Sequence, residues 1–388
     1  MKKLVTLVRN LVGILFIFSG LVKANDPLGL SYKMQEFFEI WNAGLASSSF
    51  FLSSMLISTF QYLHAHALAL SVLLIAFEII AGVALLLGWQ IKLMSKLLFA
   101  ITLFFTFLTA YAYFSGKFKN CGCFGDCLPI SAKTSFIKDV VLTGLIIFLL
   151  YSQKYIKPIF SFGKTLFAML ATIIFSFAFQ WYVLNYLPVV DCLPFKVSNN
   201  IKEQMKTPVG AIADSFAIRF VYEKRGTKFE FSPSELPSDL GSYKYIDRID
   251  KQIRKGNAEP PIKGFALNDE NNNNFTSIVL AEKYCLILFS ENLSKASKFW
   301  KEEMLIINTL AAEKNIPLYI VTSSVVEAKK EVANTAFENL PFFNCDYTAI
   351  RTAARTNPTL YLLNEGTIIN KWGEKELSKI IPVLSDLK

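Results

Sequence analysis

The chain has 388 residues, of which 53% are hydrophobic, and its 35 phenylalanines help to exclude a wholly water-soluble protein. Residues 1–187 contain 14 Lys and Arg against 6 Asp and Glu, whereas residues 188–388 contain 26 against 25. The net charge of +9 therefore belongs almost entirely to the apolar half, and it requires no nucleic acid as a partner.

Five windows in the first half are long and apolar enough to cross a bilayer, which takes about 20 helical residues. The charge-free stretch 44–63 is a sixth candidate, but its many serines favour an interfacial or re-entrant segment. We therefore predict a multi-pass helical bundle of five spans, near residues 4–22, 67–88, 93–114, 135–152 and 165–186.

Basic residues gather beside the first span, at the turn between the second and third, and in the loop between the fourth and fifth. Such residues mark cytoplasmic loops. We therefore expect a bacterial inner-membrane protein with a cytoplasmic N-terminus, and with residues 188–388 in the periplasm. The sequence Val22-Lys23-Ala24 would also fit a signal-peptidase site, but Arg9 within the apolar run argues against cleavage.

Residues 188–260 are mixed and polar, and we expect them to form an extracytoplasmic connecting segment. Residues 218–222 and 228–231 are predicted to pair as a β-hairpin across the turn at 224–227. The charged stretch 251–261 ends in two prolines and is the expected linker.

Residues 261–388 are predicted to form a small α/β domain. From Cys285 onward the apolar pattern alternates between strands and helices, and it finishes in a hairpin and a helix, which indicates a central sheet. The expected strands are 285–289, 317–321, 341–343, 359–363 and 367–371, and the expected helices are 295–310, 326–335 and 377–387.

The run Asn357-Pro358-Thr359, followed by a strand and a glycine turn, resembles the second half of a thioredoxin fold. Phe265–Asp269 resembles the lead-in strand of its TlpA-like branch. The resemblance implies a cis-proline loop at Pro358. The Cys-x-x-Cys of that family would fall at Leu293–Ala296, where no thiol is present. It therefore implies a domain without thioredoxin chemistry at that position, whose cis-proline loop serves as architecture or as a peptide-binding groove.

The membrane half carries a second pattern. It consists of Arg9, Gly13, Phe16, Ser19, Gly20 and Lys23 in the first span, Glu78 and Gly82 in the second, and the loop Cys121-Gly122-Cys123-Phe124-Gly125. This pattern resembles the DoxX/MauE family of small helical bundles. The resemblance implies a role in redox chemistry. MauE supports disulfide maturation, and DoxX is associated with a quinone-linked oxidoreductase. The bundle also resembles that of vitamin K epoxide reductase. The fusion of residues 1–187 to a thioredoxin-like domain resembles a Bacteroidetes branch.

The cysteines are the main candidates for chemistry. Cys121, Cys123 and Cys127 lie within seven residues, and Cys192 follows the fifth span. Thiol exchange needs a thiolate, a resolving partner and access, and these four residues are the candidate catalytic set. The alternative is a permanent disulfide that joins Cys121 or Cys123 to Cys127 or Cys192 in an oxidising compartment. No metal site is predicted, because Cys-x-Cys-x3-Cys is not a standard zinc spacing.

Glu78 lies in the middle of the second predicted span, where an ionisable group is a functional candidate. It would relay protons to a quinone or pair with Arg9 inside the bundle. His64 and His66 are the only histidines. Their i,i+2 spacing puts them on different helix faces, which disfavours a shared metal ion. Each histidine is a candidate contact for a quinone head group, and the alternative is that each simply lies at the membrane interface.

Two functions remain open from the sequence. The first is a thiol–disulfide oxidoreductase of the inner membrane, coupled to a quinone, that acts on periplasmic thiols or a periplasmic redox protein through Cys121/Cys123 and Cys127/Cys192. The second is a non-enzymatic accessory subunit of an envelope or protein-export complex, in which the α/β domain docks a partner and the cysteines are structural. The missing Cys-x-x-Cys favours the second function, and the Cys-Gly-Cys-Phe-Gly motif favours the first.

Overall fold

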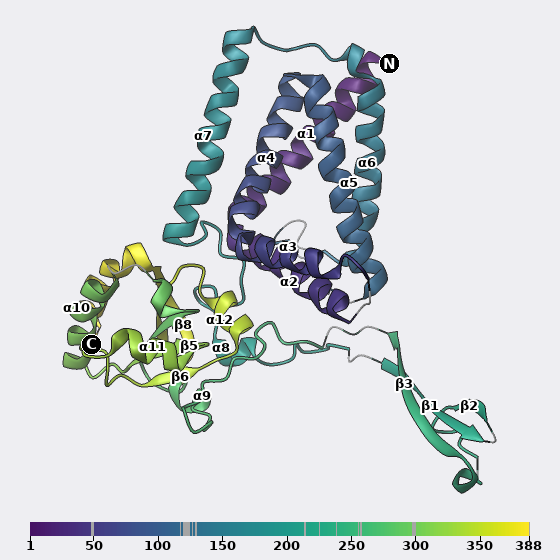
Figure 1. Cartoon of the computed structure of the whole chain (residues 1–388). Coiled ribbons are helices and arrows are strands. Elements are labelled where there is room, and N and C mark those ends of the chain that lie inside the picture. The colour runs from purple at the N-terminus through teal and green to yellow at the C-terminus, as the bar shows by residue number, and fades with distance from the viewer. Residues whose placement is uncertain are drawn as a thin grey trace.

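The computed structural model describes every residue except 48–49, 117, 119–124, 126, 129, 213–214, 225, 238, 255, 257, 297–299 and 388. A helical bundle occupies the first half of the chain, an α/β unit lies beyond one end of it, and a narrow three-stranded sheet projects away from both (Figure 1). The predicted fold class, a membrane bundle plus an α/β domain, is confirmed.

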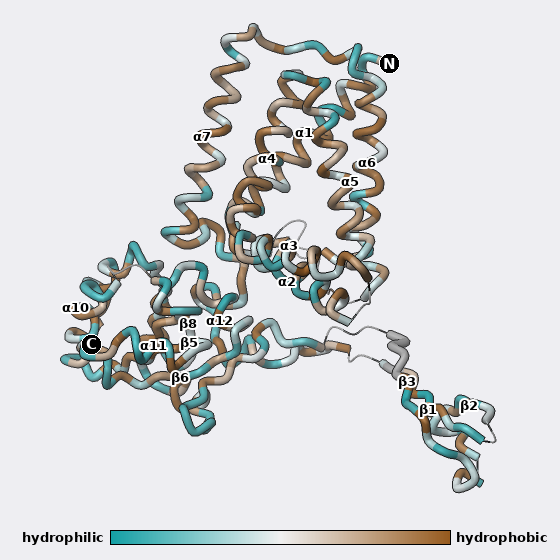
Figure 2. Tube along the Cα trace, viewed as in Figure 1, coloured by the Kyte–Doolittle hydropathy of each residue, from teal (hydrophilic) through white to brown (hydrophobic). Residues whose placement is uncertain are grey.

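Five helices of the bundle are long and apolar enough to cross a membrane, and their surfaces are mostly hydrophobic (Figure 2). Their bounds agree with the predicted spans within three residues. They are α1 (Lys2–Ala24), α4 (Ala67–Leu87), α5 (Ile91–Ser115), α6 (Ala132–Tyr151) and α7 (Phe162–Tyr186).

Two further helices, α2 (Pro27–Ala46) and α3 (Ser53–Ala65), lie across the end of the bundle that faces the α/β unit (Figure 1). The stretch 44–63 is therefore the end of one helix and most of another, and neither helix is a candidate span. Helix α2 begins where Asp26 accepts a hydrogen bond from the backbone N–H of Gly29, with Pro27 at the first helical position.

Close packing of α1 on α4 depends on small residues. A Cβ atom at Gly82 would stand 2.9 Å from the carbonyl oxygen of Gly13 and 2.8 Å from the side chain of Ile17. A Cβ atom at Gly20 would stand 2.6 Å from Ile79. Glycine at these positions lets the two helix backbones approach, as small residues do between membrane helices.

Each segment that connects two helices lies at one or the other end of the bundle. The N-terminus, the α4–α5 turn and the α6–α7 connection lie at the end far from the α/β unit (Figure 1), where the backbone N–H of Ile159 donates to the carbonyl of Leu87 at 3.1 Å. The segment after α7 lies at the other end, beside the α/β unit. The basic connections on which the topology prediction rests thus share one end of the bundle.

The α/β unit is built on a five-stranded sheet with the order β6-β5-β4-β7-β8. Strands β4, β5 and β6 are parallel, whereas β7 and β8 are antiparallel to their neighbours. All five predicted strands are present within two residues. They are β4 (Cys285–Ser290), β5 (Leu318–Thr322), β6 (Phe342–Asn344), β7 (Thr359–Asn364) and β8 (Thr367–Gly373).

Helices cover both faces of this sheet. Residues of α10 (Trp300–Glu313), α11 (Val325–Val332) and α13 (Ile380–Asp386) pack in one buried cluster, and residues of α9 (Thr276–Val279) and α12 (Tyr347–Ala353) pack in the other. The predicted helix at 295–310 corresponds to α10, and Lys295, its first predicted residue, belongs instead to a 3₁₀ turn at 293–295. Helix α12 was not predicted.

Part of the expected connecting segment belongs to the α/β core. Phe195 and Ile201 are buried in it, and the short helix α8 (Ile201–Gln204) follows. The backbone N–H of Ile262 then donates to the carbonyl of Gln204 at 2.9 Å. The residues between Gln204 and Ile262 therefore form an insertion whose two ends lie side by side in the α/β unit.

This insertion carries the three-stranded antiparallel sheet, in the order β2-β1-β3. Its strands are β1 (Ser215–Lys224), β2 (Thr227–Phe231) and β3 (Lys244–Arg254). The predicted hairpin is confirmed as β1 and β2. The prediction that 251–261 is all linker was wrong, since residues 251–254 pair with β1. Their charged side chains concealed the strand.

Candidate functional site

A disulfide joins Cys127, in the connection between α5 and α6, to Cys192, just after α7. The two Cα atoms are 4.8 Å apart, the residues are separated by 65 positions, and both are half-buried. The other two members of the candidate set, Cys121 and Cys123, lie outside the described residues. The structure thus joins two of the four predicted catalytic cysteines, at the bundle end that faces the α/β unit.

Asn25, the residue that ends α1, holds this disulfide in place. Its carboxamide makes a two-way pair with the backbone of Val190, because Oδ1 accepts from the N–H at 2.9 Å and Nδ2 donates to the carbonyl at 2.8 Å. The same Nδ2 lies 3.9 Å from the Sγ of Cys127. A single side chain therefore fixes the segment that carries Cys192 and points a donor at the sulfur of Cys127.

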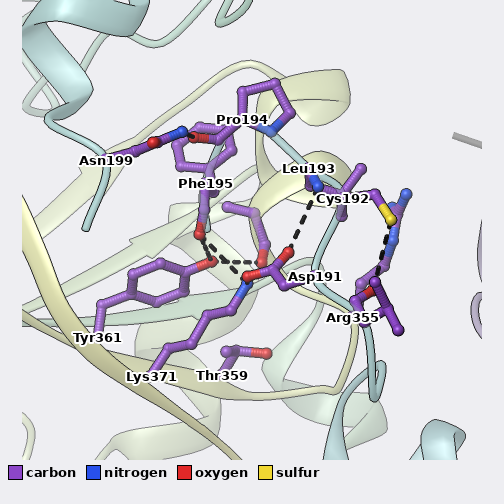
Figure 3. A network of polar contacts seen from close by, with 12 residues as sticks. Asp191, Cys192, Leu193, Pro194, Phe195, Asn199, Arg355, Thr359, Tyr361 and Lys371 are labelled. Carbon is purple, nitrogen blue, oxygen red and sulfur yellow. Dashed lines mark hydrogen bonds and ion pairs between the residues drawn. The ribbon is translucent and has the colours of Figure 1, made fainter. Parts of the chain in front are cut away.

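An ion pair between a lysine with a buried side chain and a half-buried aspartate lies next to Cys192 along the chain (Figure 3). The Nζ of Lys371 is 2.7 Å from the Oδ2 of Asp191 and donates to the carbonyl of Phe195 at 3.2 Å. Burial lowers the pKa of Lys371, and the charge of Asp191 opposes that shift. Tyr361 lies beside the pair, donates to the carbonyl of Ala353 at 2.8 Å, and has a pKa raised well above its usual value by burial. The segment after α7 is thereby locked to β7 and β8.

A second ion pair connects the bundle to the α/β unit directly. A guanidinium nitrogen of Arg355 lies 2.8 Å from the Oδ2 of Asp26, and both side chains are largely buried. Asp26 also caps α2, so this carboxylate both begins that helix and binds Arg355 of the α/β unit. The contact places the start of α2 against the loop that precedes β7.

The same surface continues through aromatic stacking. The guanidinium of Arg351 lies 4.2 Å from the ring centroid of Tyr32, on α2, and 3.9 Å from that of Tyr347. Glu291, just after β4, accepts from the hydroxyl of Tyr347 at 2.9 Å and from Arg351 at 3.3 Å. Burial raises the pKa of Tyr32 to about 12. The residues that follow β4 thus face the membrane bundle.

The loop that precedes β7 contains a cis peptide bond between Asn357 and Pro358. Asn357 accepts from the hydroxyl of Ser290 at 2.5 Å and donates to the carbonyl of Asn292 at 2.7 Å. Thr359, at the start of β7, donates to the carbonyl of Thr356 at 2.9 Å. These bonds fasten the loop to the end of β4.

The two remaining cysteines are buried and free. Burial raises the pKa of Cys285 to about 12 and that of Cys345 to about 11. Since the thiolate is the reactive species, both thiols are inert at neutral pH. Among the described cysteines, only Cys127 and Cys192 are not fully buried, and they form the disulfide.

Glu78 does not form the predicted pair with Arg9. Its Oε1 lies 2.5 Å from the Nζ of Lys23, and its Oε2 accepts from the hydroxyl of Ser19 at 3.1 Å. Because α1 and α4 run antiparallel, Glu78 meets the last turns of α1. Arg9 lies 14 positions earlier, about 21 Å along the axis at 1.5 Å per residue. The prediction of an Arg9–Glu78 pair was therefore wrong.

The two histidines lie at the junction of α3 and α4, whereas Glu78 lies within α4. His64 ends α3, where its Nε2 lies 2.9 Å from the Oε1 of Glu39 on α2. His66 lies in the break itself, and its Nδ1 is 2.9 Å from the carbonyl of Tyr62. These contacts place both rings at the interfacial helices rather than inside the bundle.

With this geometry in place, the comparisons with known proteins concern two parts of the chain. Residues 1–152 match the family of methylamine utilisation protein MauE. The MauE-like region covers α1 to α6 and includes Cys127, whereas α7 and Cys192 lie beyond it. Residues 216–255, which contain β1 to β3, match a domain of unknown function, DUF8463. No curated protein and no solved structure matches the chain.

Several residues of this site were not found from the sequence. Asn25, Lys371 and Arg355 had no distinguishing pattern, because each acts on a segment far away along the chain. Lys23 gave no signal of depth either, because it lies just beyond the predicted span 4–22 whereas Glu78 lies in the middle of 67–88. A comparison of depths along the predicted spans favours Arg9, and only the packing of α1 on α4 brings Lys23 to Glu78.

Proposed function

We propose that this protein is a thiol–disulfide oxidoreductase of the bacterial inner membrane that acts on thiols in the periplasm. One observation carries the proposal. A half-buried disulfide joins the MauE-like region to the segment after α7, and the Asn25 carboxamide lies next to one of its sulfurs. A buried staple needs no such donor, whereas a disulfide that opens benefits from one, because a hydrogen bond to the departing thiolate stabilises it.

The position of Asn25 assigns roles to the two sulfurs. A substrate thiolate attacks the Sγ of Cys192, the Cys127–Cys192 bond breaks, and Cys127 leaves as a thiolate that accepts from Asn25. A second substrate thiolate then attacks the substrate's sulfur in the mixed disulfide, which forms the substrate disulfide and releases Cys192 as a thiolate. Re-forming the Cys127–Cys192 disulfide requires the removal of two electrons and two protons. A disulfide between Cys121 and Cys123 would take them up by becoming two thiols, and a membrane quinone would serve as the final oxidant.

The proposed orientation rests on the positive residues at the end of the bundle far from the disulfide. A cytoplasmic location of that end would put Cys127, Cys192 and the α/β unit in the oxidising periplasm. A reporter fused after residue 388 tests this orientation. Activity of a periplasm-specific reporter is expected, and activity of a cytoplasmic one would contradict the proposed compartment.

We also propose that the α/β unit is thioredoxin-like and that it acts as a docking module. Support comes from the strand order, the cis bond before Pro358 and the position of that loop beside the end of β4. Residues 188–204 and 261–388 would form this unit, 1–187 the bundle, and the segment with β1 to β3 an insertion in place of the expected connecting domain.

An accessory role in an envelope or protein-export complex is the second candidate. It is favoured by the contacts after β4, where Glu291 and Arg351 lie against Tyr32 of α2, so that the bundle occupies the edge at which thioredoxin-like domains meet substrates. In this case the α/β unit would connect the bundle to a partner, and the disulfide would be permanent.

One experiment separates the two candidates. Cysteine redox states are trapped in cells with an alkylating mass tag, with and without a block of the quinone pool. For the oxidoreductase, the reduced fraction of Cys127 and Cys192 rises when the pool is blocked, and the Cys127→Ser and Cys192→Ser variants lose oxidation of periplasmic thiols. The buried Cys285→Ser change is the matched control. A disulfide that stays oxidised under both conditions, with full function of both variants, would leave only the accessory role.

A further inference from the structure

The MauE-like region contains a cavity of about 300 Å³ between α1, α2, α4, α5 and α6. Helix α2 lies over this cavity and contributes Phe37, Phe38 and Trp41 to its wall, while α5 contributes Phe105. Neither His64 nor His66 contributes to it. The cavity volume is at the lower limit of the range for small-molecule sites, which suits one ring with a tail that leads elsewhere.

A buried ion pair lines the cavity. Lys23 and Glu78 contact each other at 2.5 Å, with side chains 5% and 2% exposed, and the Lys23 ammonium also lies 4.9 Å from the ring centroid of Phe105. An ammonium carries three N–H donors, and Glu78 accepts from one of them. Because the pair is neutral as a whole, it offers donors to a ligand without adding net charge.

A second observation points independently to a ligand. Thr102 lines the same cavity and is 1% exposed, and its Oγ1 atom has no hydrogen-bond partner among the described residues. A buried hydroxyl without a partner destabilises a protein, and each such group in a native structure calls for an explanation. A ligand acceptor within the cavity would satisfy it.

The cavity reaches the lipid-facing surface of the bundle. Leu11 on α1, Phe104 on α5 and Val141 on α6 line it, and they are 49%, 45% and 57% exposed. Since these side chains face the hydrocarbon of the membrane, a ligand would arrive from the bilayer and leave its apolar tail there.

We propose that this cavity binds the ring of a lipid-soluble quinone. The aromatic side chains of α2 and α5 flank the flat ring, one ring carbonyl accepts from the Lys23 ammonium, and another accepts from the Thr102 hydroxyl. A fatty acid is the competing ligand that the test must exclude, because lysines as well as Glu78 line the cavity. The role of this quinone as electron acceptor rests on the proposed function, whereas its binding does not.

The test is a titration of the full-length protein in lipid nanodiscs with a decyl-tailed benzoquinone. Trp41 lines the cavity, so bound quinone quenches its fluorescence, and the Trp41→Phe variant supplies the background of the other tryptophans. Saturable quenching is expected in the parent protein. The Thr102→Val change, which keeps the side-chain shape, is expected to weaken binding by about fivefold to tenfold. The matched control is Thr172→Val on α7, whose hydroxyl bonds to its own helix.

Three results would overturn the inference. They are quenching that never saturates, quenching that Thr102→Val leaves unchanged, and full reversal of the quenching by an equal concentration of decanoic acid. Failure of the redox cycle gives a different pattern. In that case binding stays saturable and sensitive to Thr102→Val, while the redox state of Cys127 and Cys192 in cells is the same with and without a block of the quinone pool.

Discussion

Asn25 is the residue on which the proposed chemistry most depends, because one carboxamide contacts both sides of the disulfide. The Asn25→Asp change keeps the size of the side chain and its acceptor for the N–H of Val190, but it removes the Nδ2 donor and places a carboxylate near the sulfur of Cys127. A like charge disfavours the thiolate. We expect the disulfide to be reduced by dithiothreitol about fivefold more slowly than in the parent.

The rate is measured by mass-tag alkylation at timed points after addition of the reductant. Asn185→Asp is the matched control, because the half-buried Asn185 side chain on α7 bonds only to its own helix among the described residues. An equal or faster rate in Asn25→Asp, with a native thermal transition, would contradict the role of this residue.

The two buried thiols allow a pH prediction. Because the pKa of Cys285 is raised to about 12 and that of Cys345 to about 11, the thiolate fraction of either is below about one in a hundred at pH 8. We expect iodoacetamide to modify neither thiol in the folded protein at pH 8, and the rate to rise towards pH 11, first at Cys345. Peptide mass spectrometry of the alkylated protein measures both sites. Rapid labelling at pH 8 before unfolding would refute the assignment.

At the scale of helices, the contact of α1 with α4 determines the depth of the bundle's charged residues. The approach of the two backbones at Gly13 and Gly82 brings Lys23 level with Glu78. A methyl group at Gly82 would meet the Gly13 carbonyl at 2.9 Å, which no rotamer change relieves. We expect Gly82→Ala to lower the midpoint of thermal denaturation in detergent by several degrees, with a loss of about 1–3 kcal/mol.

Gly144→Ala on α6 is the matched control for this change. A Cβ atom there meets nothing within 4 Å, so the higher helix propensity of alanine should raise the midpoint slightly or leave it unchanged. Equal midpoints for the two alanine variants would show that α1 and α4 are not held by this contact.

The elements that could be predicted from sequence are those with a local signal. The strand Cys285–Ser290 is apolar in all residues but the last, and the turn at Glu365 and Gly366 has the composition of a hairpin, so both were predicted correctly. Strand β3 reads Lys-Tyr-Ile-Asp-Arg-Ile-Asp-Lys-Gln-Ile-Arg, which resembles a linker until it pairs with β1. The pairing of Cys127 with Cys192 likewise depends on the bundle, because 65 positions separate the two residues.

At the scale of the whole molecule, the α/β unit is interrupted rather than preceded by the three-stranded sheet. Its chain leaves at Gln204 and returns at Ile262, where the two backbones are hydrogen-bonded at 2.9 Å. We therefore expect a variant in which a short Gly-Ser linker replaces residues 207–259 to fold, to form the Cys127–Cys192 disulfide, and to melt within a few degrees of the parent.

Circular dichroism and non-reducing electrophoresis measure the fold and the disulfide in this variant. Phe195→Ala is the contrasting change, because Phe195 is 1% exposed in the core of the same unit and its truncation should cost about 3–5 kcal/mol. Loss of the α/β fold in the linker variant would mean that β1 to β3 are part of that core after all.

The disulfide also has a topological consequence. The Cys127–Cys192 bond closes a covalent ring of chain that contains both α6 and α7, two of the candidate membrane spans, together with the connection at residues 152–161. A protease cut in that connection would leave one molecule of unchanged mass on a non-reducing gel, and would release two fragments once the bond is reduced. Cleavage at one face of the membrane would thereby report the thiol state at the other.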